Sequence, residues 1–266
     1  MIFFRLNTFV LLLVLAGIMV GATLIGLAVG RRLGKRSTSL REPFGILQGA
    51  LIGFMGLVLA FGLSLAVGRY ESRRGDVVTE ANAIGTTYLR AQTLAEPVRT
   101  ESLALLRSYS DTSITLAKIV PGSAGYDREL ATSSQYQNRL WALAGQALND
   151  RPEANAPRLY VETLNEMFDA QSVRVHGATN RVPTAVLVLE LAGAAVAVAA
   201  LALHLGTFDR SLPTVLVVAL LVTLLLGVTF DLDRPVRGLI RVPASALVDE
   251  RVAMSTPPAA IAPFHR

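Results

Sequence analysis

The chain has 266 residues, of which 52% are hydrophobic and 17% charged, and its mean hydropathy is +0.47. An ordinary soluble domain is less apolar than this, so the composition predicts a protein of the lipid bilayer. The sequence contains no cysteine, which excludes disulfides, thiolate metal sites and cysteine nucleophiles, and its three histidines argue against an imidazole metal site.

The first apolar run covers residues 8–30. It lies near the N-terminus as a signal peptide does, but it is longer than the apolar core of one. The basic stretch RRLGKR follows it, where a small-residue cleavage site would be needed. We therefore interpret this run as a retained membrane span. The loop over residues 31–42 is basic, and Pro43 marks the entry to the next span.

The second apolar run, residues 44–68, is uncharged and long enough to cross a hydrocarbon core of ~30 Å as a helix. Small residues recur along one stripe of this helix, where another backbone could pack closely: Gly45, Gly49, Gly53, Gly56 and Ala60. Bulky apolar residues form a second stripe: Leu47, Phe54, Val58, Phe61 and Leu65. This second stripe predicts either a lipid-facing surface or the dry constriction of a pore.

Beyond Gly68 the same helical period continues into water as a stalk that carries charges: Arg69, Arg73, Arg74, Asp76 and Glu80. Repeated around a ring, the arginines could attract anions to the inner mouth of a pore. The alternative is that they anchor the span to lipid headgroups. The acids could pair with the arginines along the helix or between helices.

Residues 69–182 are predicted to form an extramembrane helical domain, because dense and balanced charges alternate with apolar residues at helical intervals. The first helix continues from the span to about residue 94, and Pro97 lies where the second begins. A turn at PGSAG, residues 121–125, ends the second helix. The third helix covers about 127–149 and holds Trp141, and the fourth covers about 157–176. Their apolar stripes can bury a modest core or pack against copies of the chain.

Two further apolar runs, residues 184–205 and 212–230, are separated by a short turn, so residues 183–231 predict a helical hairpin of two spans. Glu190 lies about seven residues inside the third span, where an ionised carboxylate is costly unless it is paired or faces water. It is either a functional group or, with a shifted span boundary, an interfacial one. His204, near the end of this span, is predicted to be interfacial.

Residues 232–266 are predicted to form a juxtamembrane segment and a disordered tail, since the last dozen residues are rich in Pro and Ala. A post-span motif begins at the last residue of the hairpin and continues into this segment: Asp231, Asp233, Arg234, Pro235 and Gly238. Such acids can cap a helix, pair with arginines or, with carbonyls, bind Ca²⁺. Two clustered acids are few for six or more oxygen ligands, so the motif favours structural pairing, and no metal site is predicted.

Four spans place both termini and the helical domain on one side of the membrane. The net charge is +5, and the basic residues gather beside the apolar runs, where topology and anionic headgroups explain them better than nucleic acid does. More of them flank the side of the helical domain, namely Arg5, Arg69, Arg73, Arg74, Arg174, Arg181, Arg234, Arg237 and Arg241. The opposite side has Arg31, Arg32, Lys35, Arg36, Arg41 and Arg210. The positive-inside rule therefore prefers a cytoplasmic helical domain.

Three segments carry a resemblance to a known family: EANAIGTTYLRAQTL at 80–94, LLRSYSD at 105–111 and LDRPVRGLIRV at 232–242. They occur in the order and context of the bacterial DUF4239 family, also called the bestrophin-like domain family. The run LAFGLSLAVGRYESRRGDVVTEANAIG likewise resembles the second-span exit of bestrophin anion channels. The resemblance covers nearly the whole chain. It implies an all-α, multi-pass protein of the bacterial inner membrane, with four spans and a cytosolic helical layer.

The resemblance further implies a homo-oligomer, a five-fold ring in which the second spans line a conduit for inorganic anions. The neck of such a conduit would then be formed by Phe54, Val58, Phe61 and Leu65. The paired tryptophans that follow the Tyr-acid-Arg cluster in bestrophins are replaced here by GDVV. The alternative hypothesis is a non-conducting membrane scaffold or sensor whose helical domain binds a partner. The sequence has no Gly-rich phosphate loop, HExxH or GxSxG motif, so it predicts no catalytic residue, no cofactor and no enzyme.

Overall fold

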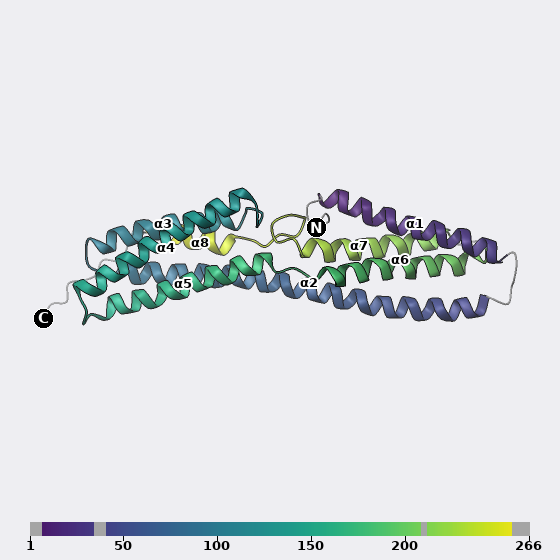
Figure 1. Cartoon of the computed structure of the whole chain (residues 1–266), viewed down its shortest axis with the longest axis horizontal. Coiled ribbons are helices and arrows are strands. Elements are labelled where there is room, and N and C mark those ends of the chain that lie inside the picture. The colour runs from purple at the N-terminus through teal and green to yellow at the C-terminus, as the bar shows by residue number, and fades with distance from the viewer. Residues whose placement is uncertain (1–6, 35–40, 209–211, 257–266) are drawn as a thin grey trace. The chain divides into compact units, whose positions relative to one another are not determined.

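The computed structural model describes residues 7–34, 41–208 and 212–256, and the regular elements within these ranges are all helices (Figure 1). In chain order they are α1 (Thr8–Gly34), α2 (Arg41–Ala91), α3 (Val98–Leu116), α4 (Ala124–Asp150), α5 (Asn155–Thr179), α6 (Thr184–Gly206), α7 (Leu212–Leu232) and α8 (Ser245–Ala253). The prediction of an all-α chain is confirmed.

The chain divides into two compact units. The first unit contains α1, α2 up to Tyr70, α6, α7 and the segment that follows α7 as far as Arg241. The second unit contains the rest of α2 together with α3, α4, α5 and α8. The helix α2 therefore contributes side chains to both units.

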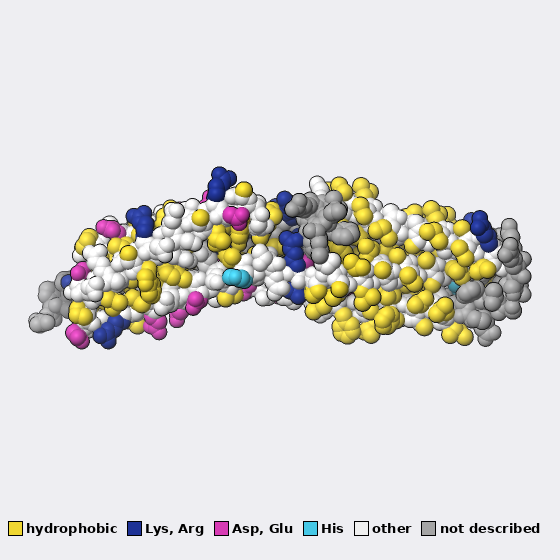
Figure 2. Space-filling model, in the orientation of Figure 1, with side chains coloured by type: hydrophobic (Ala, Val, Ile, Leu, Met, Phe, Trp, Pro, Cys, Tyr) yellow, Lys and Arg dark blue, Asp and Glu magenta, His cyan; other side chains and the backbone are white. Residues whose placement is uncertain are grey.

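The first unit holds the predicted membrane spans. Four of the described helical stretches are long and apolar enough to cross a membrane, and they include α1, α7 and the apolar parts of α2 and α6. Figure 2 shows apolar side chains covering the visible face of this unit. Many large apolar side chains point outward, among them Leu13, Ile25 and Leu221. Such exposure is expected where the surrounding medium is lipid rather than water.

Close backbone contact joins α1 to α6. A methyl group added at Gly26 would meet the backbone carbonyl of Ala199, and one added at Gly30 would meet that of Leu203. Small residues allow helices in a membrane to approach closely. The van der Waals contacts made at this distance stabilise the pair, because lipid supplies no hydrophobic driving force between helices. The two glycines therefore set the distance between α1 and α6.

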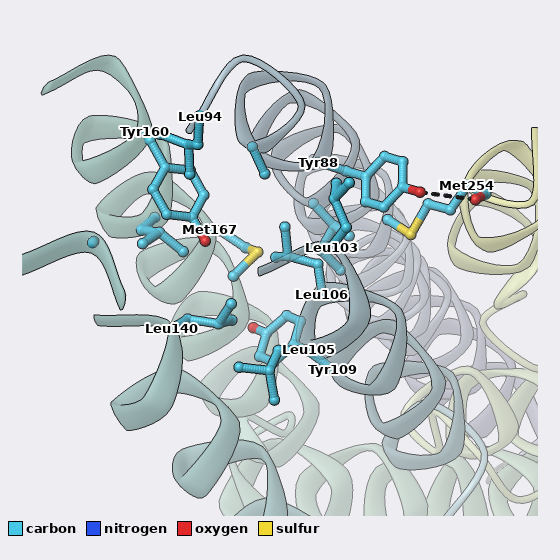
Figure 3. Close-up of a cluster of buried hydrophobic side chains, with 14 of the residues drawn as sticks. Tyr88, Leu94, Leu103, Leu105, Leu106, Tyr109, Leu140, Tyr160, Met167 and Met254 are labelled. Atoms are coloured by element: carbon cyan, nitrogen blue, oxygen red, sulfur yellow. Dashed lines mark hydrogen bonds between the residues drawn. The ribbon is translucent and has the colours of Figure 1, made fainter. Parts of the chain in front are cut away.

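The second unit has a core of its own. Its largest fully buried side chains come from α2, α3, α4 and α5, and those labelled in Figure 3 include Leu106, Tyr109, Leu140, Tyr160 and Met167. These residues recur at the three- and four-residue intervals of amphipathic helices. The predicted helical domain is thus a packed unit within one chain.

The C-terminal segment differs from the prediction for residues 232–266. It contains α8, which packs on α3 and buries Leu247 and Met254 in the core of the second unit. The hydroxyl of Tyr88 donates a hydrogen bond of 3.0 Å to the Met254 carbonyl (Figure 3). At nine residues, α8 is too short to form alone and depends on this packing, so periodicity gave little sign of it. Residues 257–266, where a disordered tail is predicted, lie outside the described part of the chain.

The turn predicted at residues 121–125 is present between α3 and α4. Gly122 has φ +76°, a backbone conformation that residues with a Cβ rarely adopt. Ser123 then caps α4, since its hydroxyl accepts a hydrogen bond from the Tyr126 amide.

We expect Gly30→Ala to lower the stability of the first unit by about 1–3 kcal/mol, because the added methyl has no room beside the Leu203 carbonyl. The measurement is thermal unfolding of the purified protein in detergent, followed by circular dichroism. Gly17→Ala, on the same helix, is the control because its added methyl meets no atom within 4 Å. Equal midpoints for the two variants would contradict the close contact.

Candidate functional site

The helix α2 contacts the rest of the first unit through one face. Met55, Leu59 and Ala66 are buried on that face, and Gly62 lies against α6. The small-residue stripe predicted for packing lies elsewhere on the helix. Of its members, Gly45 contacts the His204 ring, where an added Cβ would lie 3.1 Å from Cε1. At the others the chain leaves open space: Gly49, Gly53 and Gly56 have no atom within 4 Å of an added Cβ, and Ala60 is exposed.

The bulky stripe also points away from the chain. Phe54 is 60% exposed, Phe61 62% and Leu65 47%, while Val58 is half-buried. Beside α2, an apolar groove of about 230 Å³ runs between α2, α6 and α7, and its lining includes Gly56, Ala197 and Val222. The outward sides of α2 can therefore meet lipid, a second copy of the chain or a shared conduit.

The charges predicted at the mouth do not share one environment. Arg74 is exposed and forms an ion pair of 3.6 Å with Glu71. Arg73 is only 5% exposed and donates hydrogen bonds to the carbonyls of Gly177 and Asn180, at 3.2 and 2.6 Å. These two carbonyls lie at the C-terminal end of α5, where backbone acceptors lack helical partners. Arg73 therefore caps α5 rather than facing water.

Glu80 is likewise an interior group, and its partner is an arginine of another helix rather than one of the stalk arginines. Its side chain is fully buried and forms an ion pair with Arg174 of α5, which is 6% exposed. Positions 73, 77, 80 and 84 lie on one helical face, so Glu80 enters the core beside Val77. Asp76 is half-buried, and burial raises the pKa of its carboxyl while Arg174 opposes that shift. Arg69 is also half-buried.

The buried ion pair is extended by neutral side chains from other helices. Ser113 of α3 donates to Glu80 at 2.8 Å, and Gln171 of α5 donates to Ser113 at 3.2 Å. The amide oxygen of Gln171 in turn accepts from Ser133 and Gln137 of α4, each at 2.9 Å. Sequence reasoning missed these partners. The available signal was a carboxylate placed three residues after Val77 on the apolar face of α2.

The post-span motif folds into a backbone-binding cluster. Asp231 accepts hydrogen bonds from the amides of Leu239 and Ile240, both at 2.8 Å, and from the Thr8 hydroxyl at 3.2 Å. Gly238 has φ +118°, and an added Cβ there would collide with the Asp231 carboxylate. The carboxylate therefore holds the segment after α7 in a tight turn.

The remaining members of the motif lie inside the first unit. Asp233 accepts a hydrogen bond of 3.1 Å from the Val182 amide. Arg234 and Pro235 are buried. Burial lowers the pKa of the Arg234 guanidinium, Asp231 opposes that shift, and other nearby arginines add to it. Within the described ranges no group of three or more His, Cys, Asp or Glu side chains could hold a metal ion. Asp231 and Asp233 thus accept hydrogen bonds from backbone amides, which the sequence analysis did not name as their partners.

Two titratable residues lie within α6. Glu190 is fully buried and faces Gly62 of α2. His204 contacts Gly45, and its ring meets that of Phe208 edge to face, with centroids 5.4 Å apart. Both residues therefore face other parts of the first unit.

The sequence profile of the Bestrophin-like domain matches residues 13–247. Among solved structures, a bestrophin homologue from Klebsiella pneumoniae aligns with a TM-score of 0.65 at 14% identity, over 89% of this chain and 98% of that chain. A variant of the Klebsiella pneumoniae homologue aligns with a TM-score of 0.65 at 15% identity, over 90% and 99%. At these identities the likeness shows a shared fold. A search of the curated proteins gives no match.

We expect Arg174→Met to destabilise the second unit by about 3–5 kcal/mol, because it leaves the Glu80 carboxylate buried without its cation. The double variant Glu80→Met with Arg174→Met should recover most of that loss, and Arg74→Met should change stability by no more than about 0.5 kcal/mol. Thermal unfolding followed by circular dichroism measures all three. A loss of similar size for Arg74→Met would show that the buried pair has no special role.

We expect Gly238→Ala to destabilise the first unit by about 1–3 kcal/mol, since the residue is held at positive φ against the Asp231 carboxylate. Gly75→Ala, a helical site with open space, is the control.

Adding Ca²⁺ or a chelator should leave the unfolding midpoint of the wild-type protein unchanged, because the Asp231 carboxylate oxygens already bind backbone amides. If Ca²⁺ raised the midpoint of the wild-type protein but not that of Asp231→Asn, the result would instead identify a calcium site.

Proposed function

We propose, from the premise that this chain belongs to the bestrophin-like domain family, that copies of it assemble around α2 into an ion channel of the bacterial inner membrane. Family membership and the membrane-length helices establish a bestrophin-like membrane protein. The proposal adds the assembly, the conduit and its lining. By resemblance the ring is five-fold and the ions are inorganic anions.

The observation that carries the proposal is the asymmetry of α2. One face is buried in the first unit, as Leu59 and Ala66 show, while Gly53 and Phe61 lie on exposed sides. A single-sided contact leaves room for a neighbouring copy along the glycine stripe, where backbones can approach closely. In such an assembly the bulky stripe would line a central conduit.

A ring of bulky apolar side chains would close such a conduit by excluding water. Repeating Phe54, Phe61 and Leu65 around the ring gives layers one or two helical turns apart along α2. Of the charges after Gly68, Arg74 is exposed and Arg69 half-buried, so these two arginines can influence ions near the mouth. Arg73 and Glu80 instead hold α2 against α5.

We place both termini and the helical domain in the cytoplasm, on the distribution of basic residues around the spans. Several residues that enter this distribution, Arg5, Lys35, Arg36 and Arg210, lie outside the described part of the chain.

A non-conducting scaffold or sensor is the second candidate function. It is favoured by large apolar side chains exposed on the second unit, including Leu89 at 64%, Val173 at 57% and Trp141 at 45%. A water-soluble partner could cover such side chains. A neighbouring copy of the chain could cover them as well, so the measurement of current separates the two functions.

We expect the purified protein to have the mass of an oligomer in detergent and to conduct ions after reconstitution in planar bilayers. Phe61→Ala should raise the current by widening the apolar constriction. Leu220→Ala is the control, because Leu220 is similarly exposed, at 57%, but lies on α7. A monomeric mass, or silence of both wild-type protein and Phe61→Ala under ion gradients, would favour the scaffold.

A further inference from the structure

Glu190 is chemically isolated in the membrane-spanning unit. The four apolar stretches, residues 8–30, 44–68, 184–205 and 212–230, contain one charged residue between them, and it is Glu190. It lies six residues after the first residue of α6, about 9 Å along the helix axis. A charged side chain at such a position costs free energy because it is removed from water. It is therefore taken as a candidate functional residue.

The carboxyl group of Glu190 lies in the space left by the missing side chain of a glycine. Glu190 is fully buried, and its carboxyl occupies the space that a side chain at Gly62 of α2 would fill. Neither carboxyl oxygen has a hydrogen-bond partner among the described residues. The group is therefore enclosed between α6 and α2 without the donors that normally stabilise a buried carboxylate.

The apolar stretches around the carboxyl group offer no charge to balance an ionised carboxylate. The first charge beyond them on α2 is Arg69, seven residues past Gly62 and about 10 Å further along the helix, and Arg181 precedes Glu190 by nine residues. The helices of the first unit, α1, α2 and α7, bring no charged or titratable side chain within their apolar stretches. On α6 itself, His204 lies fourteen residues further on, about 21 Å along the helix, and contacts Gly45 instead. A buried charge without a partner costs several kcal/mol or more, whereas a neutral acid costs far less.

A single carboxyl group is also a poor ligand for a metal ion. Ca²⁺ takes six to eight oxygen ligands and Mg²⁺ takes six, and neither oxygen of Glu190 has even one polar partner among the described atoms. The proton needs no further ligand. It therefore suits this place better than any other cation.

We propose that Glu190 is a proton-binding site inside the membrane-spanning unit, where the neutral acid is seated against Gly62 and holds α6 in contact with α2. Release of the proton leaves a charge that must reach water or a cation, so the ionised form favours separation of α6 from α2 at this level. Proton binding and the contact between the two helices are thereby linked. The inference stands whether or not the protein conducts ions.

The test uses the full-length protein in vesicles of neutral lipid at neutral pH. Dicyclohexylcarbodiimide is an apolar reagent. The O–H group of a protonated carboxyl adds across one of its C=N bonds, and the O-acylisourea so formed rearranges to a stable N-acylurea without loss of a leaving group. We expect mass spectrometry to find the adduct on Glu190 and not on Glu71, whose side chain is 56% exposed on α2. Infrared spectra should show the C=O band of a neutral carboxylic acid in the wild-type protein, and Glu190→Gln should lack it.

A matched pair of glycine variants tests the seat itself. Gly62→Ala should displace the carboxyl and reduce labelling of Glu190 several-fold, whereas Gly68→Ala, where an added methyl meets no atom within 4 Å, should keep wild-type labelling. Equal labelling in both variants would overturn the assignment of Gly62.

Two results with the wild-type protein alone would overturn the proposal, even if the variants do not fold. One is the absence of both the adduct and the acid band, which would show that Glu190 is ionised. The other is suppression of both signals by sodium at constant pH, which would show that a metal cation occupies the place.

Discussion

The structure depends on the packing of α2, which contributes buried side chains to each of the two units. Leu59 and Ala66 are buried in the first unit, and Val77 and Ile84 are buried in the second. Within each unit, α2 packs through an apolar helical face. Any polar residue that falls on it must find a partner inside the protein, as Glu80 does, while the other sides of α2 stay available for contacts beyond the chain.

Buried polar groups in the two units are handled in different ways. In the second unit Glu80 has Arg174 and a series of hydrogen-bonded neighbours, so its charge is balanced and its oxygens are used. Asp231 is satisfied mainly by backbone amides. Glu190 has neither arrangement, which is why the proton is the simplest occupant. Burying a carboxylate costs free energy in both units. Glu80 offsets this cost with a fixed ion pair, whereas Glu190 offsets it by binding a proton that can be released.

Hydropathy and helical periodicity predicted the helices well, because both follow from local sequence. The spans, the turn at residues 121–125 and the four helices predicted for residues 69–182 agree with the structure within a few residues, whereas α8 was not predicted. Contacts between distant segments were harder, since α2 has several sides and periodicity does not say which one is buried. The glycine stripe at Gly49 and Gly53 was as plausible a packing face as the one that contains Gly62. Partners such as Arg174 could not be identified, because nothing local to Glu80 specifies a residue 94 positions away.

The one tryptophan of the sequence, Trp141, belongs to the second unit, on α4. It is 45% exposed, and its indole is tilted against the Phe168 ring with centroids 6.3 Å apart. The membrane-spanning unit contains no indole at all. Intrinsic fluorescence excited in the indole band therefore reports on the helical domain alone, so its emission can follow the opening or docking of that domain in lipid vesicles without an added dye.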